Sequence, residues 1–168
     1  GAVGSTTNFG LTAARALEAG KIDGFWANGM GTEVAVRSGA GTVVLDARRG
    51  DGPKKCFDYT MASIATTERL IEASPDTVAA AIRAIVKTQK ALKADVSLAT
   101  KVGRALFPPQ EAALIAELIG RDLPYYDVAI SERSVAGMND FACGVGILKA
   151  DVSYDQVVAT EFSEFWQS

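Results

Sequence analysis

The sequence predicts an α/β fold with a parallel sheet in the first third of the chain. Two observations support this: short apolar runs alternate with helical patterns, and each apolar run is followed by polar residues or glycine. The expected order is strand 2–4, helix 9–19, strand 22–26, helix 32–38 and strand 42–46. This βαβαβ order requires parallel strands joined by right-handed crossovers.

The helix expected over residues 9–19 has recognisable signals at both ends. Asn8 is a suitable N-cap, and Gly20 can adopt the left-handed conformation that commonly ends a helix. Leu11 and Leu17 belong to one apolar stripe between these ends. We therefore expect this helix to pack on one side only.

A charged loop rich in glycine and proline follows the expected sheet and is the clearest internal boundary. We divide the chain into residues 1–50, which hold the βαβαβ unit, residues 51–66, a crossover, and residues 67–168, which are mostly helical. Within the crossover, residues 57–65 alternate well enough to form a strand.

Helical periodicity dominates the chain beyond residue 66. Ser74 and Pro75 are typical of a helix start, with an N-cap followed by proline at the first helical position. The helix that follows has one apolar face, formed by Val78, Ile82, Ile85, Val86 and Leu92. The other expected segments are helices 96–106 and 109–119, an extended segment 123–130, and two helices capped by Ser131 and Ser153.

Residues that follow the expected strands are the best candidates for a ligand site, because the carboxyl ends of parallel strands meet at one edge of a sheet. They are Ser5, Thr6, Trp26, Asn28, Gly29, Gly31, Tyr59 and Thr60. An indole face, an amide side chain and free N–H groups at a helix start can bind a planar or anionic solute. The alternative is that Trp26 and Tyr59 are packing residues and the others form ordinary turns and loops.

Composition argues against several other functions. The net charge is −3 and no basic run is longer than a pair, so the chain lacks the charge that nucleic-acid binding requires. It contains no histidine, which removes Ser–His and Cys–His nucleophiles and the commonest zinc ligand. We therefore expect no catalytic residue, no metal site and no cofactor. Cys56 and Cys143 are expected to be free thiols.

Several segments, taken in their order along the chain, carry a family resemblance. They are residues 16–31, residues 33–36, the apolar run 42–46, residues 92–95, residues 106–109 and residues 157–162. On these segments the chain resembles the substrate-binding proteins of ABC transporters for thiamine precursors, sulfonates and nitrate, the NMT1/THI5-like group. The resemblance covers nearly the whole chain, and the chain resembles about the second half of such a protein.

The resemblance implies a type II periplasmic-binding-protein fold, present here as part of one Rossmann-like lobe, a crossover and the helix-rich remainder of the other lobe. It also implies non-catalytic binding of a small aromatic or anionic solute, delivery of that solute to an ABC transporter permease, and a periplasmic or extracytoplasmic location. Two alternatives stay open. One is a pyrimidine-synthase-type enzyme of the same superfamily, although its expected histidine and cysteine cluster are missing, and the other is the effector-sensing domain of a transcription regulator.

Apolar surfaces are expected to need a partner if the chain is one half of a two-lobed protein. Such surfaces include those around Ile64, Ile82 and Phe162. Because large exposed apolar patches drive association, we expect self-association, by exchange of lobes around the loop 49–55. Phe165 and Trp166 are expected to pack beside Phe162 rather than to bind a ligand.

Overall fold

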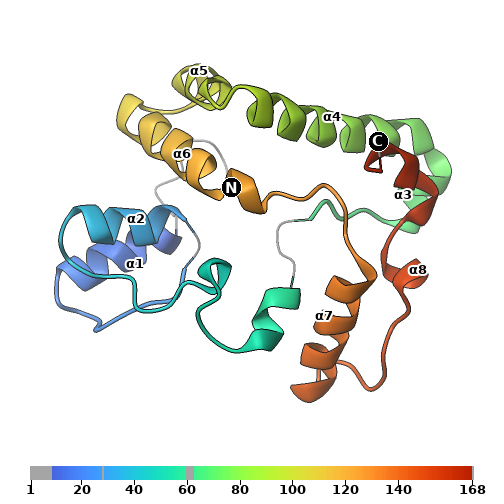
Figure 1. Ribbon diagram of the computed structural model, residues 1–168, viewed down its shortest axis with the longest axis horizontal. Coiled ribbons are helices and arrows are strands. Elements are labelled where there is room, and N and C mark those ends of the chain that lie inside the picture. Colours follow the sequence, from blue (N-terminus) through green and yellow to red (C-terminus); the bar gives the residue numbers. More distant parts are fainter. Residues whose placement is uncertain (1–8, 28, 60–62, 168) are drawn as a thin grey trace. The chain divides into compact units, whose positions relative to one another are not determined.

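The computed structural model describes residues 9–27, 29–59 and 63–167, and these are predominantly helical (Figure 1). They form two compact units, each made of two segments that are distant in sequence. The first unit draws on Gly1–Asp46 and Ala91–Pro124, and the second on Ala47–Lys90 and Tyr125–Ser168. None of the described helices is long and apolar enough to cross a membrane.

The predicted parallel sheet is wrong, because residues 9–27, 29–59 and 63–167 contain no strand. The expected strands 22–26 and 42–46 are irregular segments, and strand 2–4 lies outside the described residues. The expected strand 57–65 begins inside a 3-10 helix, and its other described residues are irregular. The α/β fold class, the Rossmann-like lobe and the type II periplasmic-binding-protein fold all require that sheet and are corrected with it.

The sheet is missing because a strand needs a neighbouring segment to pair with. A strand is stabilised by hydrogen bonds to a neighbouring segment and by burial of one face, and the alternation of apolar residues supplies neither. Val44 is 92% exposed and Trp26 is 79% exposed. These two apolar runs therefore lack the packing surface that would make them strands.

The first unit begins with two packed helices, α1 (Phe9–Glu18) and α2 (Met30–Arg37). Their backbones approach closely where Gly31 faces Gly10: a Cβ built on Gly31 would lie 2.4 Å from the carbonyl oxygen of Gly10. Only glycine permits this approach. The predicted stop after α1 is confirmed, since Gly20 follows the helix with a φ of 65°.

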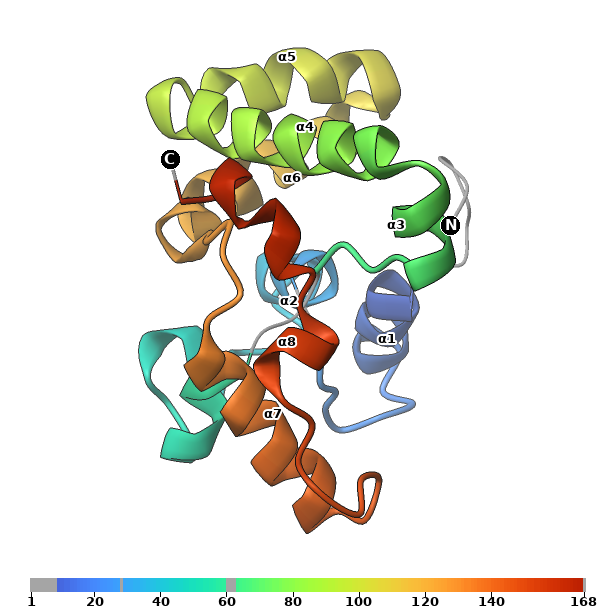
Figure 2. The ribbon, with the colours of Figure 1, turned by 90° about the vertical axis from the view of Figure 1, so that its right-hand side faces the viewer.

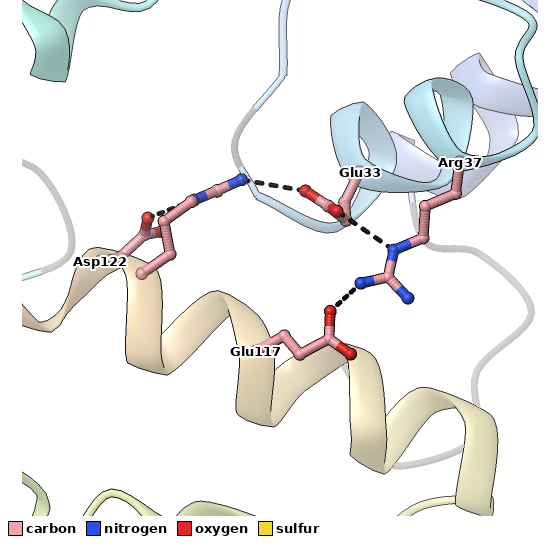
Figure 3. Close-up of polar contacts among 5 residues, drawn as sticks. Glu33, Arg37, Glu117 and Asp122 are labelled. Atoms are coloured by element: carbon pink, nitrogen blue, oxygen red, sulfur yellow. Dashed lines mark hydrogen bonds and ion pairs between the residues drawn. The ribbon is translucent and has the colours of Figure 1, made fainter.

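A second helix pair of the first unit consists of α5 (Ser97–Leu106) and α6 (Pro109–Asp122). Small residues again form the contact, because Gly103 lies against Ala112 and both are buried. Proline at the first position of α6 provides the expected helix start. Figure 3 shows an ion pair between Glu117 of α6 and Arg37 of α2, which connects the two helices.

The second unit has its core beside α4 (Pro75–Ala94), a 20-residue helix that follows α3 (Glu68–Ala73). The residues of α4 after Lys90 belong to the first unit. Val78 and Ala79 of α4 pack against Phe162 of the 3-10 helix η4 (Thr160–Phe165). In Figure 2 this C-terminal segment, drawn in red, lies beneath α4 and runs down towards α8. The expectation that Phe162, Phe165 and Trp166 pack together is confirmed.

Helix α7 (Glu132–Gly144) packs against the 3-10 helix η2 (Lys54–Asp58) and contacts the short helix α8 (Tyr154–Val157). Asn139 of α7 joins α7 to the segment before α8, since its amide donates to the carbonyl of Val152 at 2.7 Å and accepts from the Val152 N–H at 3.2 Å. Two further short helices are η1 (Ala47–Arg49) and η3 (Leu123–Tyr125), the latter in a segment predicted to be extended.

Both predicted serine caps are confirmed. The hydroxyl of Ser131 accepts a hydrogen bond from the Ser134 N–H at 3.1 Å, at the start of α7. The N–H of Ser153 donates to the side chain of Gln156 at 3.1 Å, as in a capping box. Local sequence signals thus determine where these helices begin.

Candidate functional site

A hollow of about 490 Å³ lies entirely within the second unit. Volumes of this size are typical of sites for small organic ligands. Its walls come from α3 and α4 and from the segments 63–66, 127–130 and 155–161. We name it the α4 hollow.

The apolar face of α4 forms one wall of the α4 hollow. The lining residues of this helix are Val78, Ile82, Ile85, Val86 and Gln89. They recur at spacings of three and four, so that they lie on one side of the helix. The sequence predicts this apolar face. In the structure Val78 packs against Phe162, and the face also borders the hollow.

Gln89 is the polar member of that face. Its Oε1 atom is buried, and it accepts no hydrogen bond from the described residues. An unpaired buried acceptor costs about 1–3 kcal/mol. Because solvent does not reach the Oε1 atom, this oxygen is enclosed by the protein and does not open into the hollow.

The charges around the α4 hollow have one sign. Its lining includes four carboxylates, Glu68, Asp127, Asp155 and Glu161, and includes no described lysine or arginine. Asp127 accepts a hydrogen bond from the backbone N–H of Ala129 at 2.9 Å. None of the four forms an ion pair with a described residue. The electrostatic potential of the hollow is therefore negative.

Trp166 completes the lining on the side of η4. Its ring is partly buried against the core formed by Val78, Ala79 and Phe162. An indole in such a position offers a large apolar surface and a face that attracts cations. The α4 hollow thus combines aliphatic walls, an aromatic ring and a negative potential.

A smaller hollow of about 220 Å³ lies on another side of α4. It is lined by Arg83, Lys87, Lys90, Val86, Glu164 and Phe165. The Arg83 guanidinium already lies over the Phe165 ring, 5.1 Å from its centroid. This hollow is smaller and its arginine already packs over Phe165, so it is the weaker candidate for a ligand site.

Three of the site residues predicted from the sequence are found in the first unit. Trp26 is 79% exposed in an irregular segment and lines neither hollow. Gly29 precedes α2 with a φ of 35° and approaches Leu118 of α6. Gly31 is buried against α1, so helix packing alone explains its presence. Because the described residues form no sheet, the prediction of a ligand crevice at a sheet edge is wrong.

Tyr59 is the one described candidate of the second unit. Its ring packs against Phe141 of α7, with the centroids 5.6 Å apart. The structure therefore does not gather Tyr59 with Trp26, Gly29 and Gly31 in one unit. The other predicted site residues, Ser5, Thr6, Asn28 and Thr60, lie outside the described residues.

Sequence reasoning missed the α4 hollow, although one signal was present. Gln89 occupies a position of the apolar face of α4, where a leucine or valine would complete the stripe. A polar residue at such a position is either exposed or buried with a partner. Gln89 is partly exposed, and its Oε1 atom is enclosed without a partner among the described residues.

The described residues hold no group of three or more His, Cys, Asp or Glu side chains placed to bind one metal ion. The carboxylates around the α4 hollow are too dispersed to chelate together. Comparisons with family models, curated proteins and solved structures found no match to this chain. The function is therefore inferred from the geometry and from the order of the sequence segments.

Proposed function

We propose that this protein binds a small solute in the periplasm without catalysis. It then delivers the solute to the permease of an ABC importer. The single observation that carries the binding step is the α4 hollow itself, which has a volume of about 490 Å³. A hollow of this volume with apolar walls suits a small organic molecule. Delivery to an importer rests on the resemblance to ABC substrate-binding proteins.

Binding is tested by thermal unfolding with a panel of small solutes that includes pyrimidines, sulfonates, nitrate and organic amines. A solute present at 100 times its dissociation constant stabilises the native state by about 2.7 kcal/mol. We expect at least one solute to raise the melting temperature and to be recovered unchanged after incubation. Conversion of that solute to a product would instead favour the enzyme of the pyrimidine-synthase type.

A matched pair of variants places the binding in the α4 hollow. Ile85 lines the hollow and is 45% exposed, so Ile85→Trp can narrow the hollow with little disturbance of the core. Ala84→Trp adds the same ring at an exposed position of α4 outside the hollow. We expect Ile85→Trp to abolish the stabilisation and Ala84→Trp to retain it. Equal stabilisation of both variants would contradict the assignment of the site.

Delivery is tested in the cells that produce the protein. Deletion of the gene should abolish uptake of the radiolabelled solute, and the wild-type gene should restore it. Restoration by a gene that encodes Ile85→Trp should fail. Unchanged uptake after deletion would contradict the transport role and leave the binding role standing.

A further inference from the structure

We propose that Tyr154 is a positioning residue of the α4 hollow and that it holds residues 127–130, the wall segment, in place for solute binding. This inference rests on the proposed solute-binding function and extends it to a residue that is not among the described lining residues. One hydrogen bond carries it. The hydroxyl of Tyr154 donates to the carbonyl oxygen of Ile130, with 2.7 Å between the two oxygen atoms.

The wall segment has no regular secondary structure. All four of its residues line the α4 hollow, and none of them belongs to a helix. Backbone groups in a helix are held by their own ladder of hydrogen bonds, whereas an irregular segment depends on bonds to other parts of the chain. The position of the wall segment is therefore set by the bonds that it makes to its neighbours.

The bond from Tyr154 is the one hydrogen bond between described residues that joins the wall segment to another part of the chain. The other bond of the wall segment is internal, since the N–H of Ala129 donates to the carboxylate of Asp127 at 2.9 Å. Without the Tyr154 hydroxyl, the wall segment would be held by its chain ends and its apolar contacts alone.

The backbone around Tyr154 is itself well anchored. The carbonyl oxygen of Tyr154 accepts from the N–H of Val158 at 2.9 Å, and Val158 is a buried residue that also lines the α4 hollow. Two residues before Tyr154, the side chain of Asn139 makes two hydrogen bonds to the backbone of Val152, at 2.7 and 3.2 Å. The Tyr154 side chain therefore extends from a fixed part of the second unit to the wall segment.

The wall segment matters to a solute because of its apolar side chains. Val128 and Ile130 are half-buried and face the hollow as part of its lining. Apolar groups of a solute that are buried against them leave water favourably. A wall segment that moved away would remove these contacts and open the hollow to solvent, so the Tyr154 bond supports binding without touching the solute.

The experiment compares the accessibility of two walls of the hollow in the whole protein. Val128→Cys places a thiol in the wall segment, and Ile71→Cys places one in α3, which forms another wall. Both are made in a Cys56→Ser/Cys143→Ser background, and alkylation by iodoacetamide is followed with and without Tyr154→Phe. This substitution keeps the ring and removes only the hydroxyl.

We expect Tyr154→Phe to speed alkylation at position 128 about fivefold, because loss of one hydrogen bond raises the population of the detached wall segment by about this factor. Alkylation at position 71 should not change. A general loss of stability would instead speed alkylation at both positions alike, and this result would overturn the inference. An unchanged rate at position 128 would overturn it as well.

Tyr59→Phe is the matched control. It removes a hydroxyl from another tyrosine of the second unit, whose ring packs against Phe141, and it should change neither alkylation rate. An equal effect of Tyr59→Phe and Tyr154→Phe at position 128 would contradict a specific role of the bond to Ile130.

Solute binding is measured separately, with the panel used for thermal unfolding. Each solute that raises the melting temperature of the wild-type protein should raise that of Tyr154→Phe by a smaller amount, and that of Tyr59→Phe by the same amount. An equal rise in Tyr154→Phe would overturn the positioning role and leave the solute-binding function intact. If no solute of the panel binds, the proposed function fails, and the alkylation rates still decide whether Tyr154 holds the wall segment.

Discussion

Glu33 on α2 accepts a hydrogen bond from Arg121 at the end of α6, with 2.9 Å between Nη1 and Oε2. Its other carboxylate oxygen accepts from the Nε atom of Arg37, 3.1 Å away. Arg37 also pairs with Glu117, and Arg121 also pairs with Asp122 at 2.9 Å (Figure 3). These ion pairs connect two helices that are distant in sequence and stabilise the first unit.

Loss of the Glu33 carboxylate should weaken this connection. We expect Glu33→Gln to lower the free energy of unfolding by about 0.5–1 kcal/mol in urea denaturation, because it removes two partly exposed ion pairs. The difference should shrink in 0.5 M NaCl. Glu18→Gln, at an exposed position with no ion pair to a described residue, is the control. Equal stability of the two variants would contradict a stabilising role for the network.

Gly31 should be intolerant of any side chain. A Cβ there would lie 2.4 Å from the carbonyl oxygen of Gly10, so α1 and α2 would have to separate. We expect Gly31→Ala to lower the stability by about 1–3 kcal/mol, the cost of overpacking a closed contact. At Gly24 a Cβ would have open space, and Gly24→Ala should leave the melting temperature unchanged or raise it. A melting temperature of Gly31→Ala equal to that of Gly24→Ala would disprove this packing.

Cys143 should react slowly with alkylating reagents. Burial raises the pKa of its thiol, and the hydrogen bond that Sγ donates to Asp151 and the charges of Asp151 and Asp140 raise this pKa further. We expect Asp151→Asn to lower the pKa of Cys143 and to speed its alkylation by iodoacetamide at pH 8–9, in a Cys56→Ser background. Asp23→Asn, in the first unit, should not change the rate. Identical rates with and without Asp151 would refute this effect.

The same thiol makes stability depend on pH in a defined direction. Its pKa is raised in the folded state, so the folded protein keeps this proton at pH values where the unfolded chain has lost it. The contribution to stability is fully present below the ordinary thiol pKa and is lost as the pH rises through the raised value. Urea midpoints measured from pH 7 to pH 11 should therefore fall less steeply in Cys143→Ala than in the wild-type protein.

Exposed apolar side chains should lead to self-association. The accessible surface of the chain is 11945 Å², whereas two separate compact units of half its mass would expose about 9,500 Å² together. Met138 and Phe141 of α7 and Val145 directly after it form an exposed apolar stripe, and Ile147 follows at 71% exposure. We expect light scattering to detect oligomers that dissociate on dilution.

Charged substitutions within this stripe test the prediction. Val145→Lys/Ile147→Lys should shift the protein towards the monomer. Val44→Lys changes a valine of the first unit that is 92% exposed and should have a smaller effect. A wild-type protein that stays monomeric at millimolar concentration would be incompatible with this prediction.

The helices of this protein were predictable because their signals are local. The starts at Pro75, Ser131 and Ser153 and the stop at Gly20 each depend on residues within one turn of the helix end. Helical hydrogen bonds join residues four positions apart, so a short stretch of sequence holds most of the information that they need. The expected helices over residues 9–19, 96–106 and 109–119 therefore agree closely with α1, α5 and α6, whereas the helix expected after Ser153 ends at Val157 and a 3-10 helix follows.

The expected strands failed because their stability is not local. Residues 42–46 have the composition of a strand, but Val44 remains exposed and no second segment pairs with it in the described parts of the chain. A sheet requires partners that can be far away in sequence, and composition does not show whether they are present. The predicted ligand site at the sheet edge depended on the same partners.

The sequence by itself determined the helical segments, their caps and the apolar face of α4, since each follows from spacings of three or four residues. Only the tertiary structure decided that this face borders a hollow, because the lining joins α4 to segments near residues 127–130 and 155–161. It also decided that the amide oxygen of Gln89 is buried without a partner. Burial of one atom depends on every neighbour that excludes water from it, and those neighbours come from distant parts of the chain.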